Sequence, residues 1–372
     1  MAHRDIIKTI PIALLFGGLT LSGLFLPQKE YSDTERRPLA KLPSFSADSF
    51  LSGDYAEDFE TYSLDQFPLR DYFRSLKSYT TLYALGQKQV NDLYVYDGYI
   101  VKSTQRMHDS MIANAAERFN SIYRQYMADT DTHVYLSIIP DKNFFLADDA
   151  GQLSMDYPAL VENLTQATPD MEYIDIFPTL DITDYYYTDT HWKQESLLPT
   201  ADAMLTAMLK DEYKIRLSAE QYSEYRMDTP FYGVYYGQLG LPISADTLYY
   251  LSTPTLEHCI VTNYDTGAPA VADMYDLSKK NSKDPYELFL CGASALVTID
   301  NPNATTDKEL IIFRDSFGSS ITPLLVDNYA KITLVDIRYM HSGMLGNFIT
   351  FDNQDVLFLY STLVLNSSTS FK

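Results

Sequence analysis

The 372-residue sequence is short of cysteine, histidine and basic residues, and each shortage excludes a class of protein. Two cysteines, Cys259 and Cys291, are too few for a disulfide framework or a cysteine-ligated zinc cluster. We expect both to be small buried residues, with a single bridge between them as the alternative. Lysine and arginine number 28 against 50 acidic residues, a formal net charge of −22, which excludes a nucleic-acid partner. The six histidines form no metal-ligand pattern, so we expect no metal and no cofactor.

Long apolar runs are also scarce, with one exception near the start of the chain. Residues 9–26 carry no charge, and eighteen helical residues span about 27 Å, enough to cross a hydrocarbon core. Arg4 and Lys8 precede this run, as in a secretory signal, and no convincing cleavage site follows Pro27. We therefore expect a signal-anchor over residues 1–27, with the rest of a bacterial envelope protein outside the cytoplasmic membrane. A cleaved signal peptide and a buried helix are the alternatives.

The whole sequence is 46% hydrophobic, enough for a packed core. Residues 28–90 combine a linker with a helical segment broken at 65–70, where Pro68 suits a first helical turn and Asp65 a cap. In residues 91–372, short apolar runs alternate with helical segments. The predicted strands are a hairpin at 93–102 and runs at 133–140, 173–177, 287–291, 296–299, 310–313, 332–337 and 356–359; the predicted helices are 108–127, 196–209 and 319–329; and 211–285 is a β/loop-rich insertion. This alternation predicts an α/β domain with a largely parallel sheet.

The first motif that could carry chemistry is Thr-Asp-Thr-His-Trp at 188–192. An extended loop places residues two apart on the same side, so Asp189 and His191 can converge on one cleft. In a hydrolase-type triad, the aspartate fixes the histidine tautomer and stabilises its charged form. The alternative is a structural histidine beside a solvated aspartate, because the motif is short.

The second motif is Arg-Asp-Ser-Phe-Gly at 314–318, which follows the apolar run at 310–313. A serine at a strand-to-helix turn lies at the carboxyl edge of a parallel sheet, where α/β proteins place their sites. The N–H groups after Ser316 begin a helix and could stabilise an oxyanion. As the alternative, Ser316 is simply a helix cap.

With these motifs the sequence resembles the DHHW family of bacterial envelope proteins, which is related to the alginate O-acetylation proteins AlgJ and AlgX within the SGNH (GDSL-like) hydrolase superfamily. The resemblance covers most of the chain. Its motifs are YSDTERRPLA at 31–40, DQFPLR at 65–70, PDKN at 140–143, TDTHW at 188–192, RDSFG at 314–318 and DIRY at 336–339. The resemblance implies an SGNH-like three-layer domain over 91–372 and a catalytic triad of Ser316, His191 and Asp189.

Two departures from the family pattern concern the site itself. Thr190 stands at the second position of the eponymous motif, as in the alginate-type pattern, and Arg314 replaces the glycine of Gly-Asp-Ser. The oxyanion-hole glycine and asparagine have no clear counterpart, and Asn347 and Asn366 are candidates.

Four further residues are predicted to contact substrate. Arg338 and Lys142 follow strands that should end at the same sheet edge, with a surface ion pair as the alternative for Arg338. Tyr187 and Trp192 flank the Asp–His pair. The tyrosines that could form a sugar-stacking surface are Tyr185, Tyr186, Tyr187, Tyr232, Tyr235 and Tyr236, with half-buried packing as the alternative.

The resemblance implies a membrane-anchored serine O-acetyltransferase or acetylesterase acting on a cell-surface polysaccharide, with an acyl donor or a membrane acyl-transfer protein as further partner. A non-catalytic glycan-binding or scaffold protein that keeps the fold is the alternative, and Arg314 favours it. A metal-dependent hydrolase is a third hypothesis, which the lack of ligand spacing disfavours.

Overall fold

The computed structural model describes residues 10, 14, 17–19, 23, 26–213 and 216–372. The predicted signal-anchor, residues 1–27, falls largely outside this range. Among the described residues, no helix has the length and apolar character needed to span a bilayer. The chain forms two compact units: residues 1–93 with 234–243, and residues 94–233 with 244–372.

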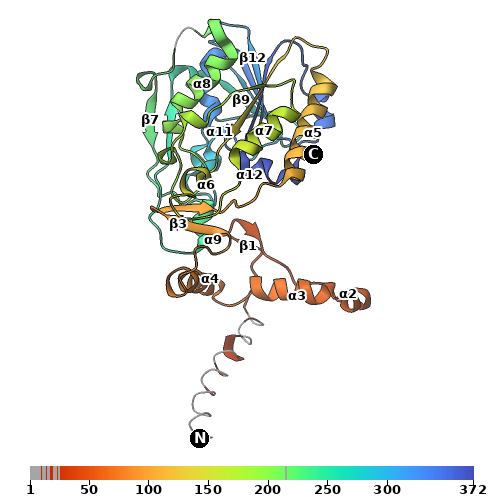
Figure 1. The fold of residues 1–372 in the computed structure, drawn as a ribbon, viewed down its shortest axis with the longest axis vertical. Coiled ribbons are helices and arrows are strands. Elements are labelled where there is room, and N and C mark those ends of the chain that lie inside the picture. The colour runs from red at the N-terminus through yellow and green to blue at the C-terminus, as the bar shows by residue number, and fades with distance from the viewer. Residues whose placement is uncertain (1–9, 11–13, 15–16, 20–22, 24–25, 214–215) are drawn as a thin grey trace. The chain divides into compact units, whose positions relative to one another are not determined.

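The larger unit contains an eight-stranded sheet in the order β10-β9-β11-β13-β12-β14-β5-β6 (Figure 1). The five strands from β13 to β6 are parallel, whereas β11, β9 and β10 pair antiparallel. The strands are β5 (His133–Ile139), β6 (Glu172–Tyr173), β9 (Ile260–Asn263), β10 (Ala270–Ala272), β11 (Leu296–Asp300), β12 (Glu309–Arg314), β13 (Lys331–Val335) and β14 (Asp355–Ser361). The prediction of an α/β fold with a parallel-rich sheet is confirmed.

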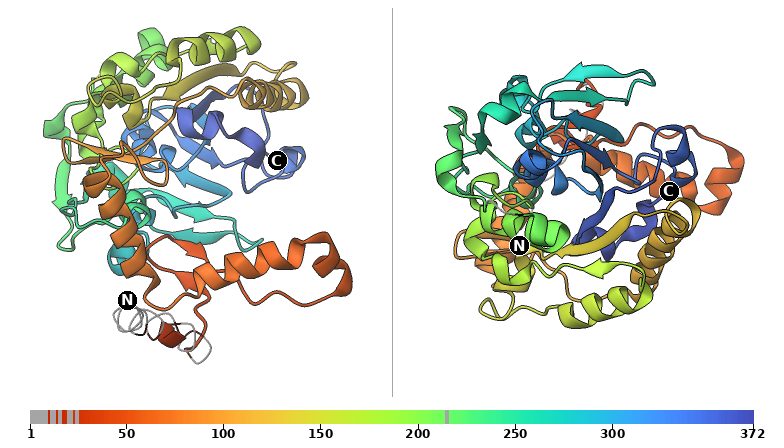
Figure 2. Two further views of the ribbon diagram at one scale, coloured as in Figure 1. Left: turned by 60° about the horizontal axis from the view of Figure 1, so that its bottom comes forward. Right: turned by 90° about the horizontal axis from the view of Figure 1, so that it is seen from above.

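Alternating side chains of the central strands face two hydrophobic cores, one on each side of the sheet. On β12, Leu310 and Ile312 join the core formed with α8 (Leu198–Leu209) and α11 (Gly318–Ile321). Ile311 and Phe313 join the opposite core, formed with α5 (Asp109–Tyr126), α7 (Tyr157–Ala167) and α12 (Thr362–Leu365). The sheet is therefore covered by helices on both faces (Figure 2).

Shorter elements complete the chain. They are β1 (Tyr31–Ser32), β2 (Arg37–Pro38), α2 (Ala47–Ser52), α3 (Asp54–Asp65), α4 (Arg70–Tyr79), the π-helix η1 (Thr80–Ala84), β3 (Leu93–Tyr96), β4 (Tyr99–Lys102), α6 (Lys142–Leu146), β7 (Ser223–Arg226), α9 (Val234–Leu239), β8 (Tyr249–Ser252) and α10 (Pro254–His258). Strands β3 and β4 form the hairpin predicted at 93–102. Within the segment 211–285, β9 and β10 are strands of the main sheet.

Several local predictions were wrong. The strand predicted at 173–177 is two residues of β6 followed by a 3-10 turn at Phe177–Thr179. The apolar run at 287–291 is not a strand, because Leu290 and Cys291 adopt left-handed φ values of 43° and 61°. Its burial arises from loop packing, since Leu288 and Leu290 are fully buried. The helix predicted at 319–329 is one turn of α11 followed by the 3-10 helix η9 (Thr322–Asn328).

In the smaller unit, an ion-pair network joins the motifs at 31–40 and 65–70. Asp65 is the last residue of α3 and not the predicted cap of the second helix: its carboxylate accepts two hydrogen bonds from Arg37, at 2.8 and 2.5 Å. The hydrogen bonds from Arg37 hold the pKa of Asp65 at about 2. Glu35 pairs with Arg70 at 2.5 Å and with Arg74 at 3.3 Å. These charges hold the start of α4 against the β1–β2 segment.

The two cysteines are not bridged. Cys259 and Cys291 are both free and partly buried, so the single-bridge alternative is excluded in this structure. Burial raises the pKa of the Cys259 thiol to about 11, which keeps it protonated and unreactive near neutral pH.

Candidate active site

The three residues predicted as a triad lie together in the larger unit, although His191 and Ser316 are 125 residues apart in the chain. Nε2 of His191 is 2.7 Å from Oγ of Ser316, and Nδ1 of His191 is 2.5 Å from Oδ1 of Asp189. Asp189 is fully buried, His191 is almost buried, and Ser316 is partly exposed. A buried carboxylate, an imidazole and an accessible hydroxyl are thus joined in one hydrogen-bonded chain.

Ser316 is held at the carboxyl end of β12 by the residue before it. Oδ1 of Asp315 accepts the N–H of Phe317 at 3.0 Å, and Oδ2 accepts the N–H of Ser361, the last residue of β14, at 2.8 Å. The turn then continues through Gly318, where a Cβ would lie 2.6 Å from Cβ of Arg314. A glycine is therefore required for the chain to turn so closely over β12.

Asp189 and His191 lie on a narrow loop closed by an antiparallel bridge between Tyr185 and Trp192. Oδ1 of Asp189 accepts both the backbone N–H of His191, at 3.0 Å, and its ring nitrogen. These two hydrogen bonds explain the two-residue spacing of the motif, because a single carboxylate oxygen fixes both the backbone and the ring of His191.

A second aspartate, Asp246, organises the same loop from a distant part of the chain. Its carboxylate accepts the N–H of Tyr187 and the N–H and hydroxyl of Thr188, at 2.8, 2.8 and 2.6 Å. The hydroxyl of Thr188 in turn accepts the N–H of Gly233 at 2.9 Å. A Cβ on Gly233 would lie 2.3 Å from Cα of Asp189, so only glycine fits against the loop that carries Asp189 and His191. Neither residue carried a signal in the sequence.

The ring of His191 lies between two aromatic side chains. Tyr286 stacks on it with centroids 3.8 Å apart and planes 6° from parallel, and Phe317 contacts it at 4.8 Å. The hydroxyl of Tyr286 donates to Oγ of Ser320 at 2.7 Å. Tyr286 is therefore tied to the helix that follows Ser316, and its ring restricts rotation of the imidazole.

Trp192 is not a substrate contact, contrary to the prediction, because its side chain is fully buried. Its indole N–H donates to Oγ of Ser320 at 2.8 Å and to the carbonyl of Phe317 at 3.2 Å. Trp192 therefore connects the histidine loop to the serine turn, which is a positioning role.

Lys142 is likewise too deeply buried to contact a polysaccharide, so that prediction is also wrong. Its Nζ donates to the carbonyls of Tyr186 and Tyr187 at 2.9 and 3.2 Å, immediately before the Asp–His motif. Burial lowers the pKa of Lys142 to about 7. The Lys142 side chain therefore supports the loop that carries Asp189 and His191 through hydrogen bonds to its backbone.

Tyr187 and Arg338 are the two remaining predicted contacts. Tyr187 is 41% exposed; its ring stacks on Tyr99 with centroids 4.1 Å apart and has Nζ of Lys193 5.6 Å from its centroid. Arg338 binds both carboxylate oxygens of the buried Asp336, at 2.9 and 2.6 Å, and keeps 18% of its side chain exposed. Arg338 therefore forms the ion pair that was its alternative role.

The other predicted site residues divide by burial. Tyr185 and Tyr186 are fully buried and cannot stack on a sugar, whereas Tyr232 is exposed. The side chain of the oxyanion candidate Asn366 is already hydrogen-bonded: its Oδ1 accepts the N–H of His108, and its Nδ2 donates to the carbonyl of Arg106. The described residues contain no cluster of three potential metal ligands.

The backbone of the serine turn offers a donor instead. The N–H groups of Phe317, Gly318 and Ser319 all bond within the turn, to Asp315 or to Ser316. The N–H of Ser316 has no such partner in the described chain. It is therefore available to an oxyanion next to Oγ.

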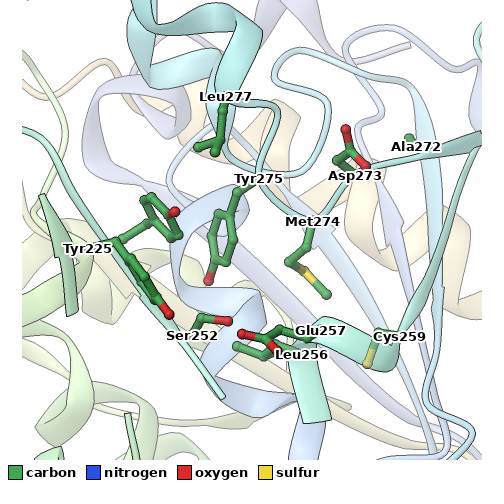
Figure 3. A pocket seen from close by; sticks show the side chains of 11 residues that line it. Tyr225, Ser252, Leu256, Glu257, Cys259, Ala272, Asp273, Met274, Tyr275 and Leu277 are labelled. Carbon is green, nitrogen blue, oxygen red and sulfur yellow. The ribbon is translucent and has the colours of Figure 1, made fainter. Parts of the chain in front are cut away.

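A pocket of about 410 Å³ opens elsewhere on the larger unit (Figure 3). It is lined by three tyrosines, Tyr225, Tyr250 and Tyr275, and by the carboxylates of Glu257 and Asp273. The hydroxyl of Tyr275 accepts a bond from Nε2 of Gln194 at 3.2 Å. The same Nε2 donates to the carbonyl of Ser320 at 2.7 Å. One buried glutamine thus connects the wall of the pocket to the helix after Ser316.

Comparison with known proteins agrees with the motifs. The DHHW protein family model matches residues 175–335, which contain Asp189, His191 and Ser316. A DHHW family protein from Eubacterium siraeum has a similar structure, with a TM-score of 0.60 and 18% identity over 76% of this chain and 94% of that one. Bacillus cereus PatB1, solved with a sulfonyl adduct, has a TM-score of 0.60 and 16% identity over 74% and 97%.

A weaker likeness, with a TM-score of 0.43 and 10% identity over 74% and 92%, is to the O-acetyltransferase domain of Pseudomonas putida AlgJ. No curated protein sequence matches the chain significantly. The family match and the shared fold together confirm that this chain resembles the DHHW proteins.

Proposed function

We propose that this chain is an SGNH-type serine O-acetyltransferase or acetylesterase that acts on a cell-surface polysaccharide. The observation that carries the proposal is the continuous hydrogen-bonded chain from Asp189 through His191 to Ser316 at the carboxyl edge of the sheet. An ordinary structural histidine does not need a partly exposed hydroxyl on one nitrogen and a buried carboxylate on the other.

In the proposed mechanism, Oγ of Ser316 attacks the carbonyl carbon of an acetyl ester while Nε2 of His191 takes the hydroxyl proton. The N–H of Ser316 stabilises the oxyanion that forms. The tetrahedral intermediate then expels the alcohol of the donor, which receives the proton from His191, and leaves an acetyl group on Ser316. A sugar hydroxyl or a water molecule attacks this acyl-enzyme with His191 again acting as base. Asp189 keeps Nδ1 of His191 protonated and stabilises the imidazolium.

Exposed aromatic faces support a carbohydrate substrate. Tyr187 lies two residues before Asp189 and is exposed, and the pocket of Figure 3 presents Tyr225 and Tyr250, whose rings stack 5.0 Å apart. Tyrosine combines a flat apolar face with a hydroxyl, which suits the C–H face and the hydroxyls of a sugar ring. The proposed acyl source is a small donor or a membrane acyl-transfer protein.

We further propose that residues 9–26 anchor the chain in the cytoplasmic membrane and that the catalytic unit works outside it. The uncharged run and the two basic residues before it support this location. The proposed substrate, a cell-surface glycan, lies in that compartment.

Hydrolysis of para-nitrophenyl acetate by the purified full chain tests the catalytic proposal. We expect turnover that survives chelators and is lost in Ser316→Ala and His191→Ala, because removing a triad member costs several orders of magnitude. Asp189→Asn should be strongly impaired, because the amide no longer fixes the tautomer of His191. Equal rates for the wild type and Ser316→Ala would favour the alternative, a glycan-binding scaffold. Loss of turnover with chelators would favour a metal-dependent hydrolase.

A further inference from the structure

Helix α4 and the π-helix η1 that continues it expose a row of large apolar side chains. The six residues are between 42% and 76% exposed, and they are Leu69, Tyr72, Phe73, Leu76, Tyr79 and Tyr83. Five of them recur every three or four residues, and Phe73 lies four residues after Leu69 and three before Leu76, so all six share one face of the helix. We call this set the α4 stripe.

The opposite face of α4 is polar and packed against the same unit. Ser78 is buried, and Arg74 donates to the carbonyls of Gly237 and Gln238 at 2.9 and 3.1 Å. Helix α4 is thus inverted relative to an ordinary surface helix, whose apolar face is directed to the core. Single apolar residues scattered over a surface are normal, but a contiguous apolar row of this length marks an interaction surface.

The position of α4 in the chain indicates what covers the stripe. The uncharged run at 9–26 ends just before two residues that are tied to the α3–α4 connection. Gln28 donates to the hydroxyl of Tyr62 at 2.8 Å. Lys29 exchanges two backbone hydrogen bonds with the side chain of Gln66, at 3.0 and 2.9 Å.

Gly23, a described residue within this run, lies close to the start of α4. A Cβ on Gly23 would be 3.5 Å from Cδ of Pro68, the residue before Leu69. If residues 9–26 cross a membrane, as proposed above, the stripe begins beside the point where the chain leaves the bilayer. The composition of the stripe agrees with this place, since three of its six residues are tyrosines, which are enriched at membrane–water interfaces.

We propose that the α4 stripe lies on the outer surface of the bilayer as an interfacial amphipathic helix. The inference rests on the proposed membrane location and not on the catalytic mechanism. Residues 1–93 carry nearly equal numbers of acidic and basic side chains, so the strong negative charge of the whole chain does not keep this unit from lipid headgroups. The stripe adds a second membrane contact to the anchor and limits how far α4 moves from the surface.

Depth-dependent tryptophan quenching tests the proposal in the full chain. The chain has a single tryptophan, Trp192, which is fully buried and gives a constant background. Tyr72→Trp and Leu76→Trp place a reporter on the stripe, and Tyr225→Trp is the matched aromatic control in the larger unit. Each variant is reconstituted into phosphatidylcholine vesicles that contain lipid brominated either near the headgroup or near the chain end.

We expect roughly half of the emission from positions 72 and 76 to be lost with shallow bromines, and less with deep ones, because an interfacial helix sits about 5–10 Å into the headgroup–acyl boundary. The control at position 225 should be unquenched. A chain that floats with vesicles but shows no quenching at position 72 overturns the inference while the anchor stands. A blue shift at position 72 without quenching also overturns it, since the stripe is then covered by protein. A chain that does not float with the vesicles overturns both the proposed anchor and the proposed stripe contact. The catalytic proposal is tested separately by ester hydrolysis.

Discussion

Replacement of Tyr286 tests whether the stacked ring positions the imidazole of His191 for the proposed reaction. In the structure the centroids of the phenol and imidazole rings are 3.8 Å apart, their planes are 6° from parallel, and the phenol hydroxyl donates to Ser320. Two variants separate these contacts. Tyr286→Phe keeps the ring and removes the hydroxyl, whereas Tyr286→Leu removes both the flat face and the hydroxyl.

The expected magnitudes follow from the two contacts. An aromatic pair contributes about 0.5–1.5 kcal/mol beyond its buried area. If this energy holds His191 in place in the transition state, its loss lowers kcat roughly two- to thirteenfold. The hydroxyl bond contributes about 0.5–1.5 kcal/mol to stability, which both variants lose. Phe317 contacts the other side of His191 and should keep the ring partly ordered in either variant.

The assay is kcat and KM for para-nitrophenyl acetate, together with the thermal midpoint of each variant. We expect Tyr286→Phe to retain kcat within about twofold and Tyr286→Leu to fall clearly below it, with little change in KM for so small a substrate. Equal kcat values in the two variants would refute a positioning role for the ring. Lower stability with unchanged kcat in both would show that Tyr286 is only a packing residue.

The remaining predictions concern the loop that carries Asp189. Asp246→Ala should lower kcat more than Asp246→Asn, because it leaves the buried N–H of Thr188 without an acceptor, at about 1–3 kcal/mol, and the part-buried N–H of Tyr187 as well. The kinetics of the two variants check this. Lys142 has a pKa of about 7 in the folded chain, against an ordinary value of 10.5. Between these two pH values the unfolded chain binds one more proton than the folded chain. The free energy of unfolding should therefore rise with pH across that window. Urea unfolding from pH 7 to pH 9 should show this rise in the wild type and a flatter profile in Lys142→Met. Alanine at Gly233 should abolish turnover, because its Cβ overlaps Asp189, and circular dichroism shows whether the fold survives.

The sequence was most informative where chemistry and local pattern coincide. The Asp–His spacing and the strand that runs into Ser316 predicted three residues that the structure places in one hydrogen-bonded chain. The buried strands β5, β12 and β14 were predicted from continuous apolar runs, which a sheet covered on both faces requires.

The supporting residues could not be predicted, because their roles depend on long-range packing. Tyr286, Asp246 and Gly233 come from loops far along the chain from Asp189, and no local pattern distinguishes them from other loop residues. Trp192 was assigned to substrate because it flanks the Asp–His pair, and Lys142 because it follows a strand that should end at the site edge. Both side chains are buried and support the loop instead. Proximity in sequence shows which element carries a side chain but not which way that side chain points.

The most direct measurement of the central claim is the site of covalent modification by a sulfonyl fluoride, read by peptide mass spectrometry on the full chain. The account predicts one adduct, located on Ser316, that disappears in Ser316→Ala and is strongly slowed in His191→Ala. Modification of a different residue, or an adduct on Ser316 that forms equally fast without His191, would contradict it.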